Sequence, residues 1–421
     1  MKKLYTLFII ALVTLFGLTS CGDEAVDVET VNKQTIFIYM PWTGNASGSD
    51  SGLLSYFKTN LNDIESAIKT NKGLNNSRVV VFLSTSPTES SFYEMIYNKS
   101  TQEIEHSNFS GYTDDGSVSA ERISNLLNEV TSKAEALNYA MIIGCHGSGW
   151  TYKEDWEDYP TRTTSTNSNK QWLFNYMASD NPNRQTRFFG SVSTTGANYQ
   201  MNIEELAEGL QNSNIVLQGQ KLQYILFDDC YMANAEVAYA LRNAANHIIA
   251  SGSEVMAYGM PYDKLWSYLN SPTPNYSSVV SSFYDFYSNY TNAPYGNLAA
   301  IDCRQIEGLA AVMKEINQNY SMSEGGIANV QVLDGFRPNL FYDLSSYVEN
   351  MGVEGMLREQ FEAQLQKTVI AAKSTEEVYT AIFRGSTIKI DQFSGLSISD
   401  PSTHPVAEKG LRNTAWWQAT H

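Results

Sequence analysis

The sequence predicts an α/β protein in which helices cover both faces of a mostly parallel central sheet of about six strands. Short, continuously apolar segments recur along the chain, as is typical of strands buried on both faces. Segments with apolar residues spaced by three and four, typical of amphipathic helices, separate several of them. Strands that alternate with helices form right-handed βαβ units, and these build a parallel sheet.

The elements follow in a regular order. We expect strands at 35–40, 78–83, from 139, 222–227, 247–251 and 297–302. We expect helices at 54–68, 123–134, 202–210, after Cys230 to about 244, and 305–319, with a small β excursion at 91–104. This pattern defines one domain over 35–320.

The pattern weakens after Ser321, and 321–421 is interpreted as a smaller C-terminal α+β extension. A short apolar segment at 341–344, a helix at about 359–372 and a β-like segment at 379–383 are expected there. The pair Trp416-Trp417 closes the region.

The N-terminus predicts a lipoprotein signal peptide over 1–21. Lys2 and Lys3 precede an apolar segment that is too short to span a membrane, and Leu18-Thr-Ser-Cys21 resembles a lipobox. Cys21 is then the lipidated N-terminus and 22–34 a tether. The protein would be exported and anchored to a bacterial cell envelope, at the outer membrane or the cell surface. The alternative is an ordinary signal peptide with a chance cysteine.

The net charge of −17 argues against binding nucleic acid, or a membrane surface by charge. Membrane attachment would come only through the N-terminal lipid, and we expect a monomer. Of the four cysteines, Cys145 and Cys303 fall in apolar segments and are interpreted as inert core thiols.

Two strand ends carry the candidate chemistry. The segment from Tyr139 delivers His146 and Gly147, and the segment 222–227 leads into Asp228, Asp229 and Cys230. In a parallel sheet, active sites lie at the carboxyl ends of the strands. A thiol at a strand-to-helix junction lies near the positive end of the helix dipole, which lowers the thiol pKa. A histidine and a cysteine at two strand ends suggest a Cys/His hydrolase.

The segments His146-Gly-Ser-Gly-Trp150 and Asp228-Asp-Cys-Tyr-Met-Ala-Asn-Ala-Glu236 resemble the two motifs of clostripain-type cysteine peptidases, relatives of gingipains, legumains and caspases. Segments at 252–254, 259–262, 341–344 and 395–398 resemble later blocks of the family. The resemblance covers about 35–417. It implies a caspase-like three-layer α/β/α sandwich, a cysteine endopeptidase and a peptide or protein substrate.

The resemblance implies a dyad in which Cys230 attacks the scissile carbonyl and His146 protonates the leaving amine. The N–H groups of Gly147 and Cys230 would form the oxyanion hole. By strand alternation Asp228 shares a face with Cys230, whereas Asp229 points the other way and is structural. The family's matching acid lines the pocket for Arg or Lys at P1.

Glu254 and Tyr258 are further candidates for the substrate pocket, and Trp150 is expected to pack the floor of the site. Relatives can carry a second acid where this chain has Met256-Ala-Tyr258, so a relaxed preference for a basic P1 residue is the alternative. For Asp228, the alternative is an acid that stabilises a helix N-terminus.

The segment 151–200 is interpreted as a surface excursion in which cleavage could activate the enzyme. Its five basic residues offer no single preferred site: Lys153, Arg162, Lys170, Arg184 and Arg187.

No cofactor is required by the sequence, and calcium dependence stays open because no EF-hand-like loop is present. A metal site made of Cys145, His146, Asp228 and Cys230 is disfavoured, because adjacent strand residues point to opposite faces. The rival function, from a different class, is a catalytically silent surface lipoprotein that binds protein or glycan.

Overall fold

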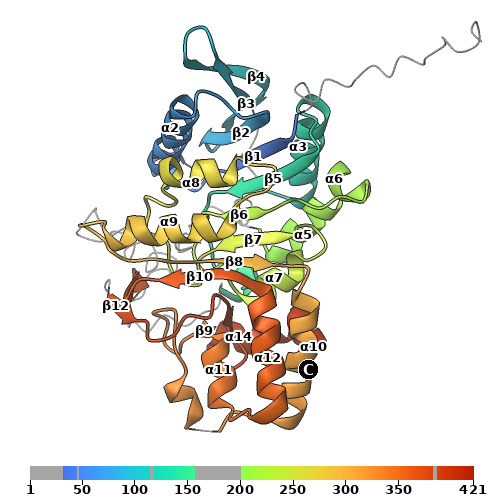
Figure 1. The fold of residues 1–421 in the computed structure, drawn as a ribbon, viewed down its shortest axis with the longest axis vertical. Helices are drawn as coiled ribbons and strands as arrows, with labels where there is room; N and C mark the ends of the chain where they lie inside the picture. The colour runs from blue at the N-terminus through green and yellow to red at the C-terminus, as the bar shows by residue number, and fades with distance from the viewer. Residues whose placement is uncertain (1–31, 45–46, 114–117, 157–200, 324, 383–385) are drawn as a thin grey trace, which may run out of the picture.

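The computed structural model describes residues 32–44, 47–113, 118–156, 201–323, 325–382 and 386–421 (Figure 1). A nine-stranded sheet in the order β10-β8-β7-β6-β5-β1-β2-β3-β4 organises them. Its strands are β1 (Gln34–Met40), β2 (Ser77–Ser86), β3 (Glu89–Asn98), β4 (Glu103–Thr113), β5 (Asn138–Ile143), β6 (Ile225–Phe227), β7 (His247–Ala250), β8 (Asn297–Asp302) and β10 (Val369–Ser374).

The middle of this sheet is parallel. β2, β1, β5, β6 and β7 pair in parallel, and their residues are almost entirely buried. The predicted three-layer fold with a mostly parallel sheet is therefore confirmed. The sheet has more strands than the expected six or so, because the β3–β4 hairpin extends one edge and β10 extends the other, where β8 and β10 run antiparallel to their neighbours.

Helices cover both faces (Figure 1). One face buries apolar residues of α2 (Leu54–Thr70), α8 (Tyr262–Leu269) and α9 (Tyr276–Ser288). The other face packs against α3 (Ala120–Lys133), α5 (Ile203–Gln211), α7 (Ala235–Leu241) and α10 (Ile306–Asn319). The remaining helices are α6 (Asn214–Leu217), α11 (Leu344–Asn350), α12 (Gly355–Thr368), α14 (Pro405–Gly410) and α15 (Ala415–Thr420). Within the described part of the chain, none of the helices is both long enough and apolar enough to span a bilayer.

The helix starts follow from local sequence. Asn202 and Glu205 form a capping box on α5, in which each side chain accepts from the other residue's main-chain N–H. The Ser119 side chain caps α3 by accepting from the Arg122 N–H. Both helices then present an apolar stripe to the sheet, which confirms the helices expected at 202–210 and 123–134.

The C-terminal region joins the central sheet. The helix expected at 359–372 ends at Thr368, and 369–374 form β10, which pairs with β8. The prediction of helix for 369–372 is wrong, because an edge position beside β8 offers this segment main-chain partners that its sequence does not reveal. Two small sheets complete the region: β11 (Glu377–Thr380) with β12 (Ser386–Lys389), and β9 (Tyr342–Asp343) with β13 (Ser397–Ile398). The boundary at 320/321 stays a prediction.

Candidate active site

Two neighbouring parallel strands bring the candidate residues to one edge of the sheet. β5 and β6 pair from Met141 beside Ile225 to Ile143 beside Phe227, where both strands end. The next main-chain bond, from Asp228 N to the Ile143 carbonyl, is 2.8 Å long and continues the contact past the strand ends. The loop with His146 and the turn with Cys230 therefore leave the sheet side by side.

Gly147 marks the closest approach of that loop and that turn. A Cβ atom built on Gly147 would lie 2.3 Å from the carbonyl oxygen of Cys230 and 2.9 Å from its amide nitrogen. No real side chain tolerates such contacts, so only glycine fits at this position. The residue after His146 thus packs directly on the main chain of Cys230.

Cys230 is completely buried in this structure. Its Sγ lies 3.2 Å from the Val255 N–H, which donates to it, and 3.8 Å from the Val255 carbonyl. Cys230 lies between β6 and α7, as predicted, but α7 begins only at Ala235, so the expected closeness to the helix N-terminus is wrong. The main-chain N–H of Val255, rather than a helix dipole, is the donor that faces the sulfur.

The turn around Cys230 is held by main-chain bonds to the segment after β7. Tyr231 N donates to the Ser253 carbonyl (3.0 Å) and Ala233 N to the Ser251 carbonyl (2.9 Å). Tyr231 has φ of 63°, a left-handed conformation that is uncommon for an aromatic residue. A residue with a strained backbone therefore directly follows the candidate nucleophile, and its neighbours fix it in place.

The two aspartates before Cys230 occupy positions opposite to those expected. The strand ends at Phe227, so alternation no longer applies. Asp228 is fully buried, and its carboxylate accepts from Met260 N (3.1 Å) and the Tyr262 hydroxyl (3.0 Å). Those partners belong to the α8 side of the sheet, whereas Cys230 is part of the core on the α7 side. The expectation that Asp228 and Cys230 share a face is wrong.

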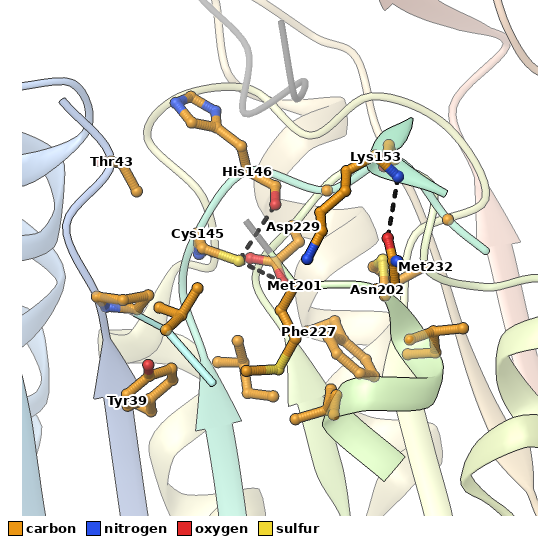
Figure 2. A pocket seen from close by; sticks show the side chains of 18 of the residues that line it. Tyr39, Thr43, Cys145, His146, Lys153, Met201, Asn202, Phe227, Asp229 and Met232 are labelled. Carbon is orange, nitrogen blue, oxygen red and sulfur yellow. Dashed lines mark hydrogen bonds between the residues drawn. The ribbon is translucent and has the colours of Figure 1, made fainter. Parts of the chain in front are cut away.

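Asp229 instead lines a pocket beside His146, together with Cys145 (Figure 2). Its Oδ1 accepts from Cys145 N at 2.6 Å, and the Cys145 thiol donates to its Oδ2 (3.4 Å) and to the His146 carbonyl (3.2 Å). Cys145 is half-buried and packs against the core from a loop beyond the end of β5, so its predicted place in a buried strand is wrong, and its inertness stays a prediction. The predicted core position is confirmed for Cys303, which is buried; burial raises the pKa of its thiol.

The pocket encloses about 120 Å³. Its walls combine polar groups near the strand ends with apolar side chains: Ile123 of α3, Ile203 and Leu206 of α5, Met201 just before α5, and Phe227 at the end of β6. Residues after β1, from Pro41 to Gly44, form part of its wall. The His146 imidazole points away from the Cys145 sulfur (Figure 2). The pocket can hold a side chain of moderate size next to His146.

None of the three predicted substrate-binding residues lies among the described residues that line this pocket. Glu254 is buried and accepts from the Tyr231 hydroxyl (3.0 Å), the Thr380 hydroxyl (2.6 Å) and Ala381 N (2.9 Å). Tyr258 donates to Asp63 (2.8 Å). With Asp228 held by Met260 and Tyr262, all three have defined internal partners.

Trp150 is fully buried and donates from Nε1 to the Ser399 hydroxyl at 2.8 Å, in keeping with the expected packing role. Lys153 lines the pocket and pairs with Glu205 at 2.9 Å. The other basic residues of the predicted excursion, Arg162, Lys170, Arg184 and Arg187, lie outside the described residues. Cys21 and the N-terminal 31 residues also lie outside them.

Within the described ranges, no group of three or more His, Cys, Asp or Glu side chains is arranged to hold a metal ion. Cys145 and His146 lie in a loop beyond β5 rather than on a strand, so the alternation of strand side chains does not apply to them and is no argument against a mixed Cys/His metal site.

The chain is similar to known proteins in sequence and in fold. The model of the Clostripain family matches residues 174–387. A secreted C11 cysteine protease from Bacteroides thetaiotaomicron, "iotapain", has 36 % identical sequence and a TM-score of 0.77, over 93 % of this chain and 100 % of that chain. A search of curated proteins gave no match.

Two further solved structures are similar. A clostripain from Bacteroides thetaiotaomicron, in complex with a peptide inhibitor, is 43 % identical over 54 % of this chain and 97 % of that chain, with a TM-score of 0.50. An inactive zymogen C11 protease from Parabacteroides distasonis shares the fold: its TM-score is 0.71 at 21 % identity, over 93 % of this chain and 99 % of that chain.

Sequence reasoning missed the involvement of Asp229 and Cys145. Their positions in the sequence could have indicated it, because Cys145 directly precedes His146 and Asp229 directly precedes Cys230. The prediction extended the alternation of strand side chains past Ile143 and Phe227, where the strands end, and so assigned Cys145 and Asp229 to the wrong surroundings.

Proposed function

Because the chain belongs to the clostripain family and is therefore a cysteine-type peptidase, we propose that Cys230 is its nucleophile and His146 its general acid and base. The observation that carries this assignment is the contact between the His146-Gly147 loop and the Cys230 turn at the ends of β5 and β6. Peptides or proteins are its substrates.

In the proposed reaction, the Cys230 thiolate attacks the carbonyl carbon of the scissile peptide bond. The main-chain N–H groups of Gly147 and Cys230 donate to the resulting oxyanion, a contribution of about 3 kcal/mol per donor. The imidazolium of His146 protonates the leaving amine as the C–N bond breaks, which leaves a thioester on Cys230. Water, deprotonated by His146, then attacks the thioester, releases the carboxylic acid and restores the thiolate and the imidazolium.

We also propose that cleavage in the 151–200 region activates the enzyme. The support is the burial of Cys230, because a fully covered sulfur cannot reach a peptide carbonyl. A change in the neighbourhood of Cys230 must therefore precede catalysis.

Limited proteolysis followed by iodoacetamide labelling and mass spectrometry tests this step. Cys230 should react slowly in the intact chain and rapidly after a cut within 151–200. Equal labelling rates before and after the cut would rule out activation by this route.

For specificity we propose Lys or Arg at P1, with Asp228 as the matching acid and Glu254 and Tyr258 as further residues of that pocket. The clostripain at 43 % identity was solved with the inhibitor BTN-VLTK-AOMK, in which lysine precedes the reactive group. Asp228 is buried here, so its carboxylate must exchange the Met260 and Tyr262 donors for the substrate cation when that pocket forms. The net charge of −17 also favours cationic substrates.

We propose that the protein is exported, as the "secreted" label of the 36 % identical protease suggests, and that Cys21 carries the lipid. Mass spectrometry of the mature N-terminus checks the second point. A Cys21→Ser variant should lose the lipid-derived mass and leave the membrane fraction.

Fluorogenic peptides that differ only at P1 (Lys, Arg or a neutral residue) test the peptidase assignment. Wild type should hydrolyse the basic substrates, and Cys230→Ala and His146→Ala should not, while their circular dichroism spectra match wild type. Activity retained by Cys230→Ala at the wild-type level would refute the nucleophile assignment.

A further inference from the structure

We propose that Asp229 is a positioning residue that fixes the His146 loop against the Cys230 turn. This inference rests on the proposed dyad. The carboxylate of Asp229 bridges two segments that are 84 residues apart in sequence, through the 2.6 Å bond from Cys145 N to Oδ1. Cys145 directly precedes His146, and Asp229 directly precedes Cys230. This bond therefore joins the two residues that precede the proposed catalytic residues.

The contacts of Asp229 lie on both sides of His146. Cys145 donates to its carboxylate with the main-chain N–H and, at 3.4 Å, with the thiol. On the other side, a Cβ built on Gly147 would lie 2.9 Å from the Asp229 Cβ, so the two residues are in direct van der Waals contact. Asp229 therefore contacts the residues on both sides of His146.

Burial makes the bridge an effective constraint. Asp229 is 2 % exposed, and a hydrogen bond in such a buried setting is stronger than one in water. The strand pairing ends at Ile143 and Phe227, so beyond this point the sheet no longer sets the spacing of the two segments. The Asp229 bridge supplies that spacing where the proposed chemistry takes place. Misplacing reacting groups by about 1 Å can cost about 100-fold in rate.

The same contacts leave the imidazole outside the bridge. The His146 side chain points away from Cys145 and the Asp229 bridge (Figure 2). The bridge acts on the main chain on either side of His146 and leaves the ring directed elsewhere. Asp229 is thus a support for the two loops that carry the proposed catalytic residues.

The experiment compares Asp229→Ala and Asp229→Asn in the activated enzyme. Alanine removes the acceptor for Cys145 N, whereas the asparagine amide oxygen can still accept that bond without a charge. We expect kcat to fall about 10- to 100-fold in Asp229→Ala with KM within about three-fold of wild type, and to recover to within about five-fold in Asp229→Asn.

Asp343 offers the matched control. It is also a buried aspartate that bridges distant segments, by accepting from Ser346 N (2.9 Å) and Ser394 N (2.5 Å), but it lies outside the pocket. Asp343→Ala should lower the melting temperature and leave kcat per folded molecule unchanged. A purely structural role for Asp229 would make Asp229→Ala behave in the same way, and that result would overturn the proposal.

Cys230→Ala is assayed in parallel so that two failures can be told apart. If Cys230→Ala is inactive and Asp229→Ala has wild-type kcat, the positioning role is wrong and the dyad stands. If Cys230→Ala is active, the proposed function itself is wrong. An Asp229→Asn variant as impaired as Asp229→Ala would also contradict the bridge, because it would show that the negative charge matters and the acceptor does not.

Discussion

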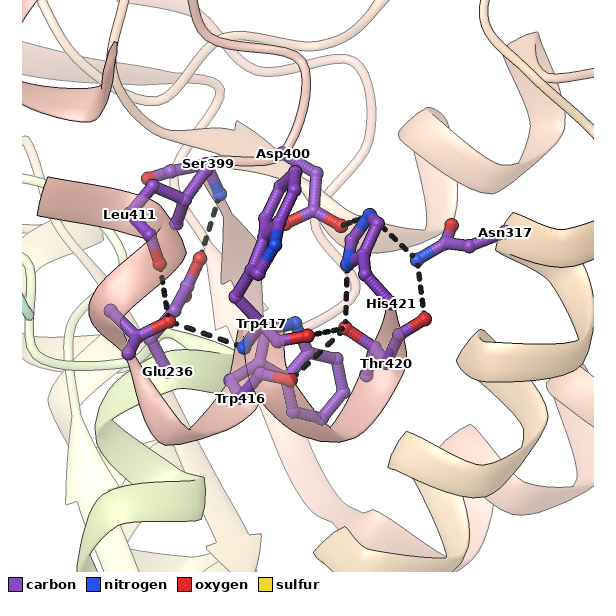
Figure 3. Close-up of polar contacts among 10 residues, drawn as sticks. Glu236, Asn317, Ser399, Asp400, Leu411, Trp416, Trp417, Thr420 and His421 are labelled. Carbon is purple, nitrogen blue, oxygen red and sulfur yellow. Dashed lines mark hydrogen bonds and ion pairs between the residues drawn. The ribbon is translucent and has the colours of Figure 1, made fainter. Parts of the chain in front are cut away.

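Two buried carboxyl groups lie where α15 packs against α7 (Figure 3). Glu236 is 1 % exposed, and the side chain of Asp400 is 2 % exposed. Burial, with repulsion from Asp400, raises the pKa of Glu236 to about 8, and burial raises the pKa of Asp400 to about 7. Ser399 N donates to Glu236 at 3.0 Å. We predict that Asp400→Asn stabilises the protein in a pH-dependent manner.

The sign and the magnitude follow from linkage. A carboxyl group with a raised folded pKa favours the folded state in its protonated form. That contribution is complete below about pH 4 and is lost as the pH rises through the folded pKa. For Asp400, the shift from 3.8 to about 7 corresponds to about 4 kcal/mol in full. Between about pH 5 and pH 8, wild type should lose about 2–3 kcal/mol of this, whereas the asparagine side chain of the variant cannot ionise.

His421 also faces this cluster, with Nε2 at 3.9 Å from the Asp400 carboxylate, and Asn317 of α10 donates to His421 (Figure 3). Burial lowers the pKa of His421, which disfavours the charged ring that an ion pair with Asp400 requires. Loss of the ion pair in Asp400→Asn therefore offsets little of the gain, and what it offsets is confined to the acidic end.

Urea unfolding followed by circular dichroism at several pH values measures the effect. The free energy of unfolding of Asp400→Asn minus that of wild type should increase by about 2–3 kcal/mol from about pH 5 to pH 8. Asp391→Asn is the control, because the Asp391 side chain is 71 % exposed and its replacement should give a flat difference. A difference for Asp400→Asn that is equally flat would refute the reasoning.

Three further predictions follow from single contacts. Gly147→Ala should abolish peptide hydrolysis and lower the melting temperature, since the new Cβ would meet the Cys230 carbonyl at 2.3 Å; wild-type turnover in this variant would contradict the close approach of the two segments. Thr380→Val removes a donor to the buried Glu254 carboxylate and should cost about 1–3 kcal/mol of unfolding free energy in urea, with no effect expected if Glu254 is solvated instead. Asn234→Ala removes the cap that accepts from Val237 N and should cost about 1 kcal/mol, whereas Asn234→Ser should recover most of it.

The pattern of apolar residues along the chain was enough to predict most of the central sheet and its helices. Continuous apolar segments predicted β1, β5, β7 and β8, and also β6, which begins at Ile225 rather than at 222, because strands buried on both faces are mostly apolar. The same patterns placed the His146 and Cys230 segments at the carboxyl ends of two strands. Parallel pairing of those strands then brought the segments together, as the alternation of strands and helices predicts.

The tertiary structure alone decided what happens beyond the strand ends. Side-chain direction follows alternation only while the ladder continues, so the exchanged environments of Asp228 and Asp229 and the pocket position of Cys145 could not be read from spacing. The pairing of β10 with β8 is likewise a contact between residues about 70 positions apart, and no local propensity encodes it. Apolar periodicity fixes which residues are buried; the partner that each buried polar group finds depends on segments far away in the sequence.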